Sequence, residues 1–408
     1  MERIIQRFLR YIAIDTKANP NAESTPSSAG QLELGKILCQ ELEEMGASEI
    51  MQDEHGYVYA KVPATSKELE KASKIGFLAH LDTSPEIDGK CDNPQFIQYT
   101  GGDIKLNDKF TMKLEDFPNL KKHIGKELIV TDGNCLLGAD DKAGLAIAME
   151  TLAEILENSN FEHGQISFCA CPDEEIGHGA SLMDLERFGA DYAFTIDGGA
   201  VGEMEYESFN AASAHLHFQG QSVHPGSAKD KMLNASDLIC AFHQLLPEQA
   251  KPQYTEGYEG FFMLEEIKAG VDEGECSYII RDHSREAFEA KKDLMRSAVQ
   301  FFNQKYASEI ISLEIKDSYY NMKDKLMDHL DIVEDLKQAM INCGITPKIA
   351  PVRGGTDGSQ LSWRGLPCPN FFAGGENFHG RYEFVPREAL GKAKEVALEL
   401  ISITAKKI

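Results

Sequence analysis

The feature that most constrains the fold of this sequence is a short apolar run that ends abruptly in acidic residues. Residues 165–171 are mostly apolar, as expected for a buried strand, and Pro172 then lacks the backbone N–H that a sheet ladder needs. Asp173, Glu174 and Glu175 follow at once, so they are predicted to lie in a loop at the carboxyl end of the strand. Ligands bind at that edge of open α/β sheets. Taken alone, the acidic run is interpreted as a solvated turn before a helix.

Two other predicted strands end in residues that can bind metals or move protons. The apolar strand predicted from Ile75 onward ends in His80, Asp82 and two hydroxyl residues, and His80 and Asp82, two residues apart, face the same side of a strand. A second run, 192–196, leads into Asp197. Continuous apolar runs of this kind are typical of a parallel sheet that is buried on both faces. The carboxyl ends of parallel strands share one edge, so these side chains are expected to converge with Glu174 and Glu175.

Two further residues are expected at the same edge. Asp140 lies where a helix running to about residue 158 begins, and His379 lies in the glycine-rich loop 374–380. Each residue also has a simpler explanation when taken singly: His80 as an interior histidine, Asp140 as a helix cap, Asp197 as a turn former. Together they would leave several negative charges uncompensated at one edge, which two divalent cations would offset. Mixed histidine and carboxylate ligands suit Zn²⁺, with Mn²⁺ or Co²⁺ as alternatives.

The chain of 408 residues is long enough for two domains. The region 209–320 is predicted to fold in the order β-α-β-β-α-β, which is the ferredoxin-like unit, and to be inserted into an α/β domain with a mostly parallel sheet. Residues 1–208 and 321–408 would form that discontinuous α/β domain. Within it, residues 85–126 are expected to be a long irregular insertion, and 353–358 a glycine-rich loop.

Composition excludes several classes of partner. Lysine and arginine total 41 against 66 aspartate and glutamate residues, which gives a formal charge of −25. This balance argues against binding to nucleic acid or to an anionic membrane. No apolar run approaches the length of a bilayer span, and the first twelve residues are predicted to form an amphipathic helix and not a signal peptide. A cytoplasmic location is therefore expected.

The motifs resemble those of the M20 family of dinuclear zinc peptidases. The segments that carry this resemblance are His80–Thr83, Gly138–Gly144, Pro172–Gly177, Asp197–Gly199 and Asn377–Gly380. A second set is similar to the tripeptide aminopeptidases within that family: Phe209–Ser213, Val223–Gly226, Thr255–Gly260, Asp317–Met322 and Arg353–Gly358. The resemblance runs along the whole chain. It implies an aminopeptidase that releases the N-terminal residue of tripeptides.

The resemblance also implies a role for each residue. His80, Asp140 and Asp197 would hold one zinc ion, and Asp140 would bridge to a second ion held by Glu175 and His379. Asp82 would orient His80, and Glu174 would be the general base that takes the proton of the attacking water. A cis peptide bond is implied between Asp140 and Asp141.

The inserted domain is expected to act as a lid and to supply contacts to a small peptide substrate. His224 is a candidate donor to the oxyanion, although a turn histidine before proline explains it equally well. Arg281 and Arg353 are candidates for binding the substrate carboxylate, and an ion pair with Asp282 is the alternative for Arg281. A ferredoxin-like module can also pair sheet edges between subunits, so a homodimer stays an open alternative.

Two other functions fit part of this pattern. A dipeptidase or an acylamino-acid deacylase of the same family would keep the metal site and differ only in its substrate pocket. A non-catalytic metal-dependent binding protein would need the metal ligands but would have no need of Glu174 as an unliganded base.

Overall fold

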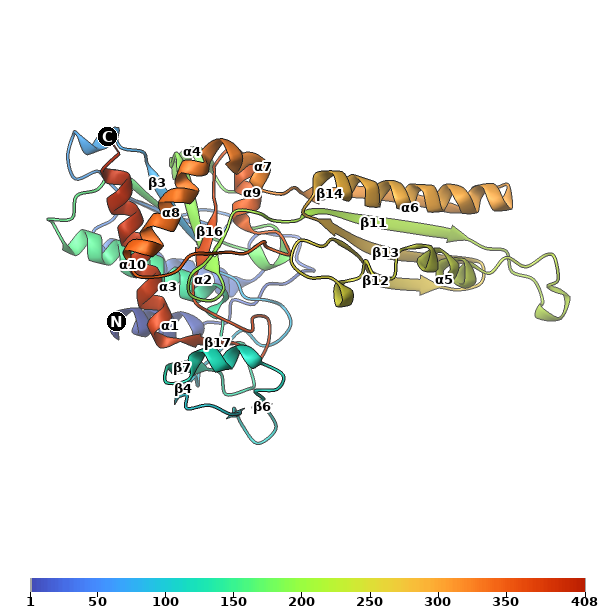
Figure 1. Ribbon diagram of the computed structural model, residues 1–408, viewed down its shortest axis with the longest axis horizontal. Helices are drawn as coiled ribbons and strands as arrows, with labels where there is room; N and C mark the ends of the chain where they lie inside the picture. The colour runs from blue at the N-terminus through green and yellow to red at the C-terminus, as the bar shows by residue number, and fades with distance from the viewer. Residues whose placement is uncertain (1, 408) are drawn as a thin grey trace. The chain divides into compact units, whose positions relative to one another are not determined.

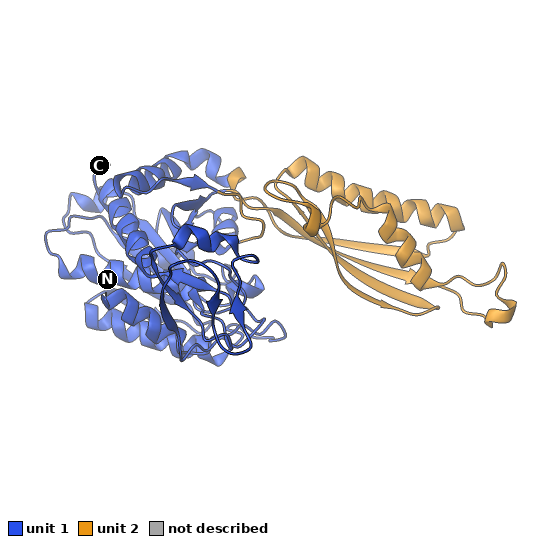
Figure 2. Cartoon of the chain, turned by 60° about the horizontal axis from the view of Figure 1, so that its bottom comes forward, with its two compact units in different colours: residues 1–206, 325–349, 356–408 blue, residues 207–324, 350–355 orange. Residues whose placement is uncertain are grey.

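The computed structural model describes residues 2–407 and divides the chain into two compact units (Figure 2). The first contains the residues up to Tyr206, Lys325–Ile349, and the residues from Thr356 onward. The second contains Glu207–Asp324 and Ala350–Gly355. It is thus larger than the predicted module 209–320 and includes a short later segment. Residues 1 and 408 of the predicted catalytic domain lie outside the described residues.

The first unit is built on an eight-stranded sheet in the order β1-β2-β8-β3-β9-β16-β10-β15. Its centre is parallel, because β3 pairs in parallel with both β8 and β9, and β9 pairs in parallel with β16. The fold class predicted from the sequence is confirmed. The strands are β1 (Ser48–Gln52), β2 (Val58–Val62), β3 (Ile75–His80), β8 (Ile166–Cys171), β9 (Tyr192–Gly198), β10 (Glu203–Glu205), β15 (Lys348–Ile349) and β16 (Asn370–Phe372).

Helices bury this sheet. Helix α3 packs on β3 and β9, and α1 and α10 pack against α3 and against each other, so the three lie side by side (Figure 1). The helices α4 and α9 also contribute to the core of this unit, because Phe188 of α4 and Leu361 of α9 form one apolar cluster with Leu78 of β3. The helices of this unit are α1 (Glu2–Ile12), α2 (Ala29–Met45), α3 (Ala139–Glu157), α4 (Leu185–Phe188), α8 (Leu330–Asn342), α9 (Asp357–Trp363) and α10 (Arg387–Ala405).

The stretch 85–126 is not the irregular insertion expected from the sequence. It contains β4 (Gln95–Gln98), β5 (Ile104–Lys105), β6 (Thr111–Met112) and the 3₁₀ helix η2 (Pro118–His123). β4 joins β7 (Glu127–Val130) and β17 (Phe384–Pro386) in a three-stranded sheet of order β17-β7-β4. The buried side chains of this region, such as Tyr99, Met112 and Leu120, form one apolar cluster. Their spacing follows neither a helix nor a strand period, so the sequence pattern did not predict these elements.

The second unit has a four-stranded antiparallel sheet in the order β12-β13-β11-β14, with α5 and α6 packed on it (Figure 1). Alternation in β11 buries Ala212, Ala214, Leu216 and Phe218 against the helices, as predicted. Its elements are β11 (Asn210–Gln219), α5 (Ala235–Leu245), β12 (Phe261–Ala269), β13 (Glu273–Asp282), α6 (Arg285–Tyr306) and β14 (Ile311–Tyr319). The short helix α7 (Lys323–Leu326) begins in this unit and ends in the first.

The glycine-rich loop expected at 353–358 ends earlier than predicted, because Thr356 begins helix α9. The Thr356 hydroxyl accepts from the Ser359 backbone N–H at 3.2 Å, and the Ser359 hydroxyl oxygen accepts from the Thr356 N–H at 3.0 Å. This reciprocal pair is a capping box formed with serine in place of the usual glutamate. Among residues 2–407, no helix combines the length and the apolar composition needed to cross a bilayer.

Candidate metal centre

The residues that the sequence places at strand ends do meet at one edge of the large sheet. His80 ends β3, Asp197 lies at the end of β9, and Glu174 and Glu175 follow β8. Asp140 opens α3, and His379 lies in the loop between β16 and β17. Five separate segments of the chain therefore contribute to one group of side chains.

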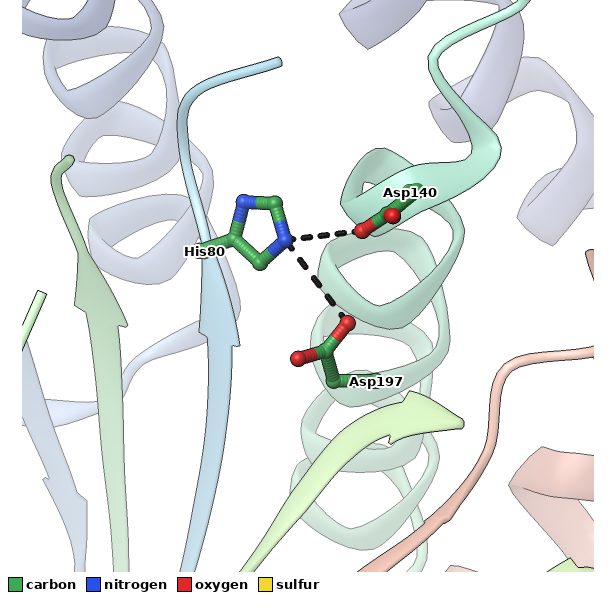
Figure 3. A group of neighbouring side chains, drawn as sticks. All are labelled: His80, Asp140 and Asp197. Carbon is green, nitrogen blue, oxygen red and sulfur yellow. Dashed lines mark hydrogen bonds and ion pairs between the residues drawn. The ribbon is translucent and has the colours of Figure 1, made fainter. Parts of the chain in front are cut away.

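His80, Asp140 and Asp197 form the first group (Figure 3). His80 Nε2 lies 2.9 Å from Asp140 Oδ1 and 3.6 Å from Asp197 Oδ1. A close approach of α3 to β9 brings the two aspartates together. Gly144 allows this approach, because a Cβ there would lie 2.0 Å from the Ile196 carbonyl oxygen.

Asp140, Glu175 and His379 form the second group. His379 Nε2 lies 3.3 Å from Asp140 Oδ2 and 3.0 Å from Glu175 Oε2. Asp140 therefore presents one carboxylate oxygen to each group. The peptide bond between Asp140 and Asp141 is cis, as the resemblance implied.

The two groups have the chemistry of a pair of metal sites. Each combines a histidine with carboxylates, which are ligands that zinc accepts. Glu175 Oε1 is buried and has no hydrogen-bond partner, so an acceptor is left over in the second group. A buried acceptor without a donor costs free energy, and a cation would supply the missing partner. The donor set therefore fits two divalent ions that share Asp140.

Asp82 ties the two strand ends together. Its carboxylate accepts hydrogen bonds from the backbone N–H groups of Glu174 and Glu175, both at 3.0 Å. His80 Nδ1 lies 3.1 Å from the Asp82 carbonyl oxygen and 3.3 Å from Asp82 Oδ1. With Nδ1 as the donor, Nε2 is free to act as a ligand, which is the orientation that the family resemblance implies for His80.

Asp173 has a structural task that the sequence did not reveal. It is fully buried and takes a left-handed conformation with φ of 57° just before Glu174. Its carboxylate accepts from the Ser27 N–H at 2.8 Å, the Ser27 hydroxyl at 2.5 Å and Gln31 Nε2 at 2.7 Å. Two residues from the start of the chain thus fix the turn that carries Glu174 and Glu175.

Electrostatics within the centre reflect negative charges buried together. Burial raises the pKa of the Glu175 carboxyl to about 7 and that of Asp197 to about 6, and the charge of Asp140 adds to both shifts. Burial likewise raises the pKa of Glu174 well above its usual range. Burial would also raise the pKa of Asp140, but hydrogen bonds from His379 and His80 outweigh it and lower that pKa. The hydrogen bonds of His379 with Asp140 and Glu175 raise the pKa of His379 to about 11. The protonated histidine therefore supplies positive charge in the metal-free protein.

Glu383 is a second buried residue that the sequence analysis missed. Its side chain is 1 % exposed, and its carboxylate accepts from the Gly138 N–H at 2.8 Å and the Asp140 N–H at 3.0 Å. These bonds fix the backbone at the shared aspartate. The available signal was a glutamate directly before the apolar residues Phe384 and Val385, where a buried charge needs a partner.

The three predicted substrate contacts lie in the second unit and belong to neither group. His224 is exposed, and its Nδ1 accepts from the Gly226 N–H at 3.2 Å. Arg353 donates to the carbonyl oxygens of Gly257 and Glu259, both at 2.9 Å, and to the Thr255 hydroxyl at 2.8 Å. Most of its guanidinium donors therefore hold the loop 255–259.

Arg281 makes fewer contacts than Arg353. It donates to the Ile280 carbonyl oxygen at 3.3 Å, and its guanidinium lies 5.3 Å from the centre of the Tyr319 ring. Asp282, the alternative partner considered for Arg281, is paired instead with Lys291 at 2.6 Å. Of the two arginines, Arg281 keeps more donors for a ligand.

Comparison with known proteins decides the family. The family model for peptidase family M20/M25/M40 matches residues 128–402. The chain belongs to the M20 peptidases. It is 48% identical over 409 residues to a protein named Peptidase T from Alkaliphilus oremlandii, covering all of both chains, and 47% identical to Peptidase T from Clostridium acetobutylicum, again over the full length of both.

Solved structures of other proteins share the fold of this M20 peptidase. An aminopeptidase PepT from Bacillus cereus superposes with a TM-score of 0.78 at 25% identity, covering 99% of this chain and 98% of that one. A tripeptidase from Staphylococcus aureus has a TM-score of 0.77 at 22% identity and covers 100% and 99% of the two chains.

Removing the Glu383 carboxylate should destabilise the backbone around Asp140, the aspartate that the two ligand groups share. We expect Glu383→Ala to lower the free energy of unfolding by about 2 kcal/mol or more, because two buried N–H groups lose their acceptor. Glu383→Gln keeps one acceptor oxygen and should lose less. Denaturant unfolding of the metal-free variants measures this order, and equal losses for the two variants would contradict the role of the paired acceptors.

The metal-free protein should become less stable as pH rises from about 5 to about 7.5. Glu175 and Asp197 have folded-state pKa values above their usual values of 4.5 and 3.8, and the pKa of His379 is also raised. In this window the folded state binds more protons than the unfolded state, so stability is lost as pH rises. Melting temperatures with and without added zinc measure the effect. Zinc should restore stability most strongly at the upper end, and a metal-free melting temperature that rises with pH would contradict this reasoning.

Proposed function

We propose that this chain is an aminopeptidase that releases the N-terminal residue of tripeptides and uses two divalent metal ions, with zinc as the native ion. The observation that carries the proposal is the Asp140 carboxylate, which offers one oxygen to each ligand group. Its relatives named Peptidase T, the aminopeptidase PepT from Bacillus cereus and the tripeptidase from Staphylococcus aureus support this activity and class of substrate. A cytoplasmic location and a homodimer stay predictions from the sequence.

His80, Asp140 and Asp197 would hold one ion, and Asp140, Glu175 and His379 the other. When bound, such ions polarise a peptide carbonyl and make water more acidic. Mn²⁺ and Co²⁺ are other ions that this donor set accepts. Asp82 keeps His80 in the tautomer that leaves Nε2 free, through the contacts of its carbonyl and carboxylate oxygens with Nδ1.

Glu174 would carry the proton. It belongs to neither ligand group, although its backbone is fixed beside Glu175 by Asp82. Its carboxylate would take a proton from the attacking water and give it to the nitrogen of the leaving amine. In the metal-free protein, burial raises the pKa of Glu174.

Residues of the second unit would bind the carboxylate of the substrate and the oxyanion formed in the reaction. Because Arg353 already binds the loop 255–259, we assign the substrate carboxylate to Arg281 first and give Arg353 a supporting part. His224 would donate to the oxyanion from its exposed loop. A positive charge that binds the carboxylate would favour peptides with a free carboxyl end.

Glu174→Gln tests the chemistry. Metal-stripped wild-type protein that has been reloaded with zinc should hydrolyse unblocked tripeptides faster than dipeptides, tetrapeptides or an amino-blocked tripeptide. The variant should bind the same amount of zinc and lose activity by roughly a hundredfold to ten-thousandfold, because the proton acceptor is gone. Full activity in Glu174→Gln would refute this mechanism, and preference for dipeptides or acylated amino acids would favour the other amide hydrolases of the family.

Arg281→Ala tests how the substrate carboxylate is bound. We expect KM for a tripeptide to rise by about tenfold or more, since a charge-assisted pair is worth about 1.5–3 kcal/mol. KM for the corresponding tripeptide amide should change little, because the amide lacks the charge. Arg281→Lys is the matched control and should recover part of the binding. Equal effects of Arg281→Ala on the acid and the amide would remove this residue from the carboxylate site.

A further inference from the structure

His379 needs support that its own loop does not supply. Its side chain is 46% exposed, and its φ is 61°, in the left-handed region. Asn377, two residues earlier, has a φ of 60°. Non-glycine residues adopt this conformation at a cost, and it persists where surrounding structure holds it. The imidazole nevertheless lies 3.0 Å from Glu175 and 3.3 Å from Asp140.

The support before His379 comes from η2. Asn119 Nδ2 donates to Glu376 Oε2 at 2.7 Å and to Asn377 Oδ1 at 3.0 Å. His123 Nε2 donates to the other oxygen of Glu376, Oε1, at 2.6 Å. The side chains of His123 and Glu376 are only 7% and 10% exposed. Both oxygens of Glu376 are therefore held by residues of one short helix.

The support after His379 comes from the same part of the chain. The Thr131 hydroxyl donates to the Arg381 carbonyl oxygen at 3.0 Å, and Arg381 NH1 donates to the Gly133 carbonyl oxygen at 2.9 Å. The Arg381 guanidinium also lies 3.9 Å from the centre of the Phe110 ring. Beyond it, β17 pairs with β7, and Phe384 is buried in the apolar cluster of Tyr99, Leu120 and Leu128.

Residues 95–133, which we name the platform segment, thus hold the loop on both sides of His379. The segment contributes no member to either of the ligand groups found among residues 2–407. Its buried cluster includes Phe384 from the far side of the loop, so its packing and the loop conformation depend on each other.

We propose that the platform segment positions His379 as a metal ligand, and that Asn119 and His123 are the positioning residues that do so through Glu376 and Asn377. This inference rests on the proposed function, in which His379 binds one of the two ions. The effect is specific to that ion: the group of His80, Asp140 and Asp197 has no direct contact with η2 among the hydrogen bonds and ion pairs of the described chain.

Cobalt binding to the metal-free full-length protein tests the inference without an activity assay. Wild-type protein should bind two Co²⁺ ions, observed by visible absorption and calorimetry. Asn119→Ala and His123→Ala should each leave one ion at wild-type affinity and weaken the other by about tenfold, as found when groups that orient a ligand are removed. His123→Gln should keep most of the affinity, since its amide can still donate to Glu376.

Tyr99→Phe is the matched control. Tyr99 lies in the same segment and its hydroxyl donates to the Gly102 carbonyl oxygen at 2.7 Å, away from Thr131 and from residues 376–384, and the variant keeps the ring in the apolar cluster. It should lower the melting temperature about as much as Asn119→Ala and leave both cobalt affinities unchanged. If it weakens cobalt binding as much as Asn119→Ala, general loosening explains the effect and the inference is overturned.

A double variant separates this inference from the proposed function. In a His379→Ala background, Asn119→Ala should cause no further loss of cobalt affinity, because the ligand it positions is absent. An additional tenfold loss would overturn the inference, as would unchanged cobalt affinities in both Asn119→Ala and His123→Ala. Wild-type protein that fails to bind two ions would instead overturn the proposed function, and the inference with it.

Discussion

The carboxylate of Asp140 is the contact on which the rest of the site depends. It faces His80 with one oxygen and His379 with the other, and it lies close to two other acids, Glu175 and Asp197. Burying acids this close together is unfavourable unless positive charge compensates them. The surrounding structure restrains them in a fixed arrangement: Asp82 holds the turn after β8, Glu383 holds the backbone of Asp140, and Asp173 is tied to residues 27 and 31. Many of the hydrogen bonds around the site thus hold the acidic side chains in positions from which they could coordinate a cation.

The sequence predicted most of the residues that come together in the site. It predicted few of the contacts that fix those residues in place. Strand ends are visible as apolar runs that stop at polar residues, and a parallel sheet brings such ends to one edge. This reasoning placed His80, Asp140, Glu175 and Asp197 together, and the structure has them in two adjoining groups. His379 was expected at the same edge from its place in a late loop, but its assignment with Glu175 to the second group came from the family resemblance, because nothing in a glycine-rich loop shows which way a histidine points.

The parts that sequence reasoning missed depend on contacts between distant segments. Glu383 and Asp173 are ordinary acids in the sequence, and their tasks appear only when the backbone N–H groups of other segments come within reach. Arg353 is a candidate for the substrate carboxylate, and the sequence did not reveal that most of its donors bind a loop about 95 residues earlier in the chain. The elements in 95–126 lack any periodicity and are stabilised by a shared apolar cluster, which no local pattern reveals. Periodicity therefore predicts helices and strands that have one buried face. It does not predict which distant segments will contact one another.

The dispersal of the ligand groups along the chain has a consequence for biosynthesis. His80 is made early, Asp140, Glu175 and Asp197 follow, and His379 is added only after the whole second unit and α8 have been made. Helix α10, which packs on α3, comes later still. While the residues between Asp197 and His379 are being added, a chain still attached to the ribosome thus has one ligand group complete and the other open. A nascent chain of this kind would acquire its second ligand group, and with it the capacity for hydrolysis, only after the chain has been made as far as His379.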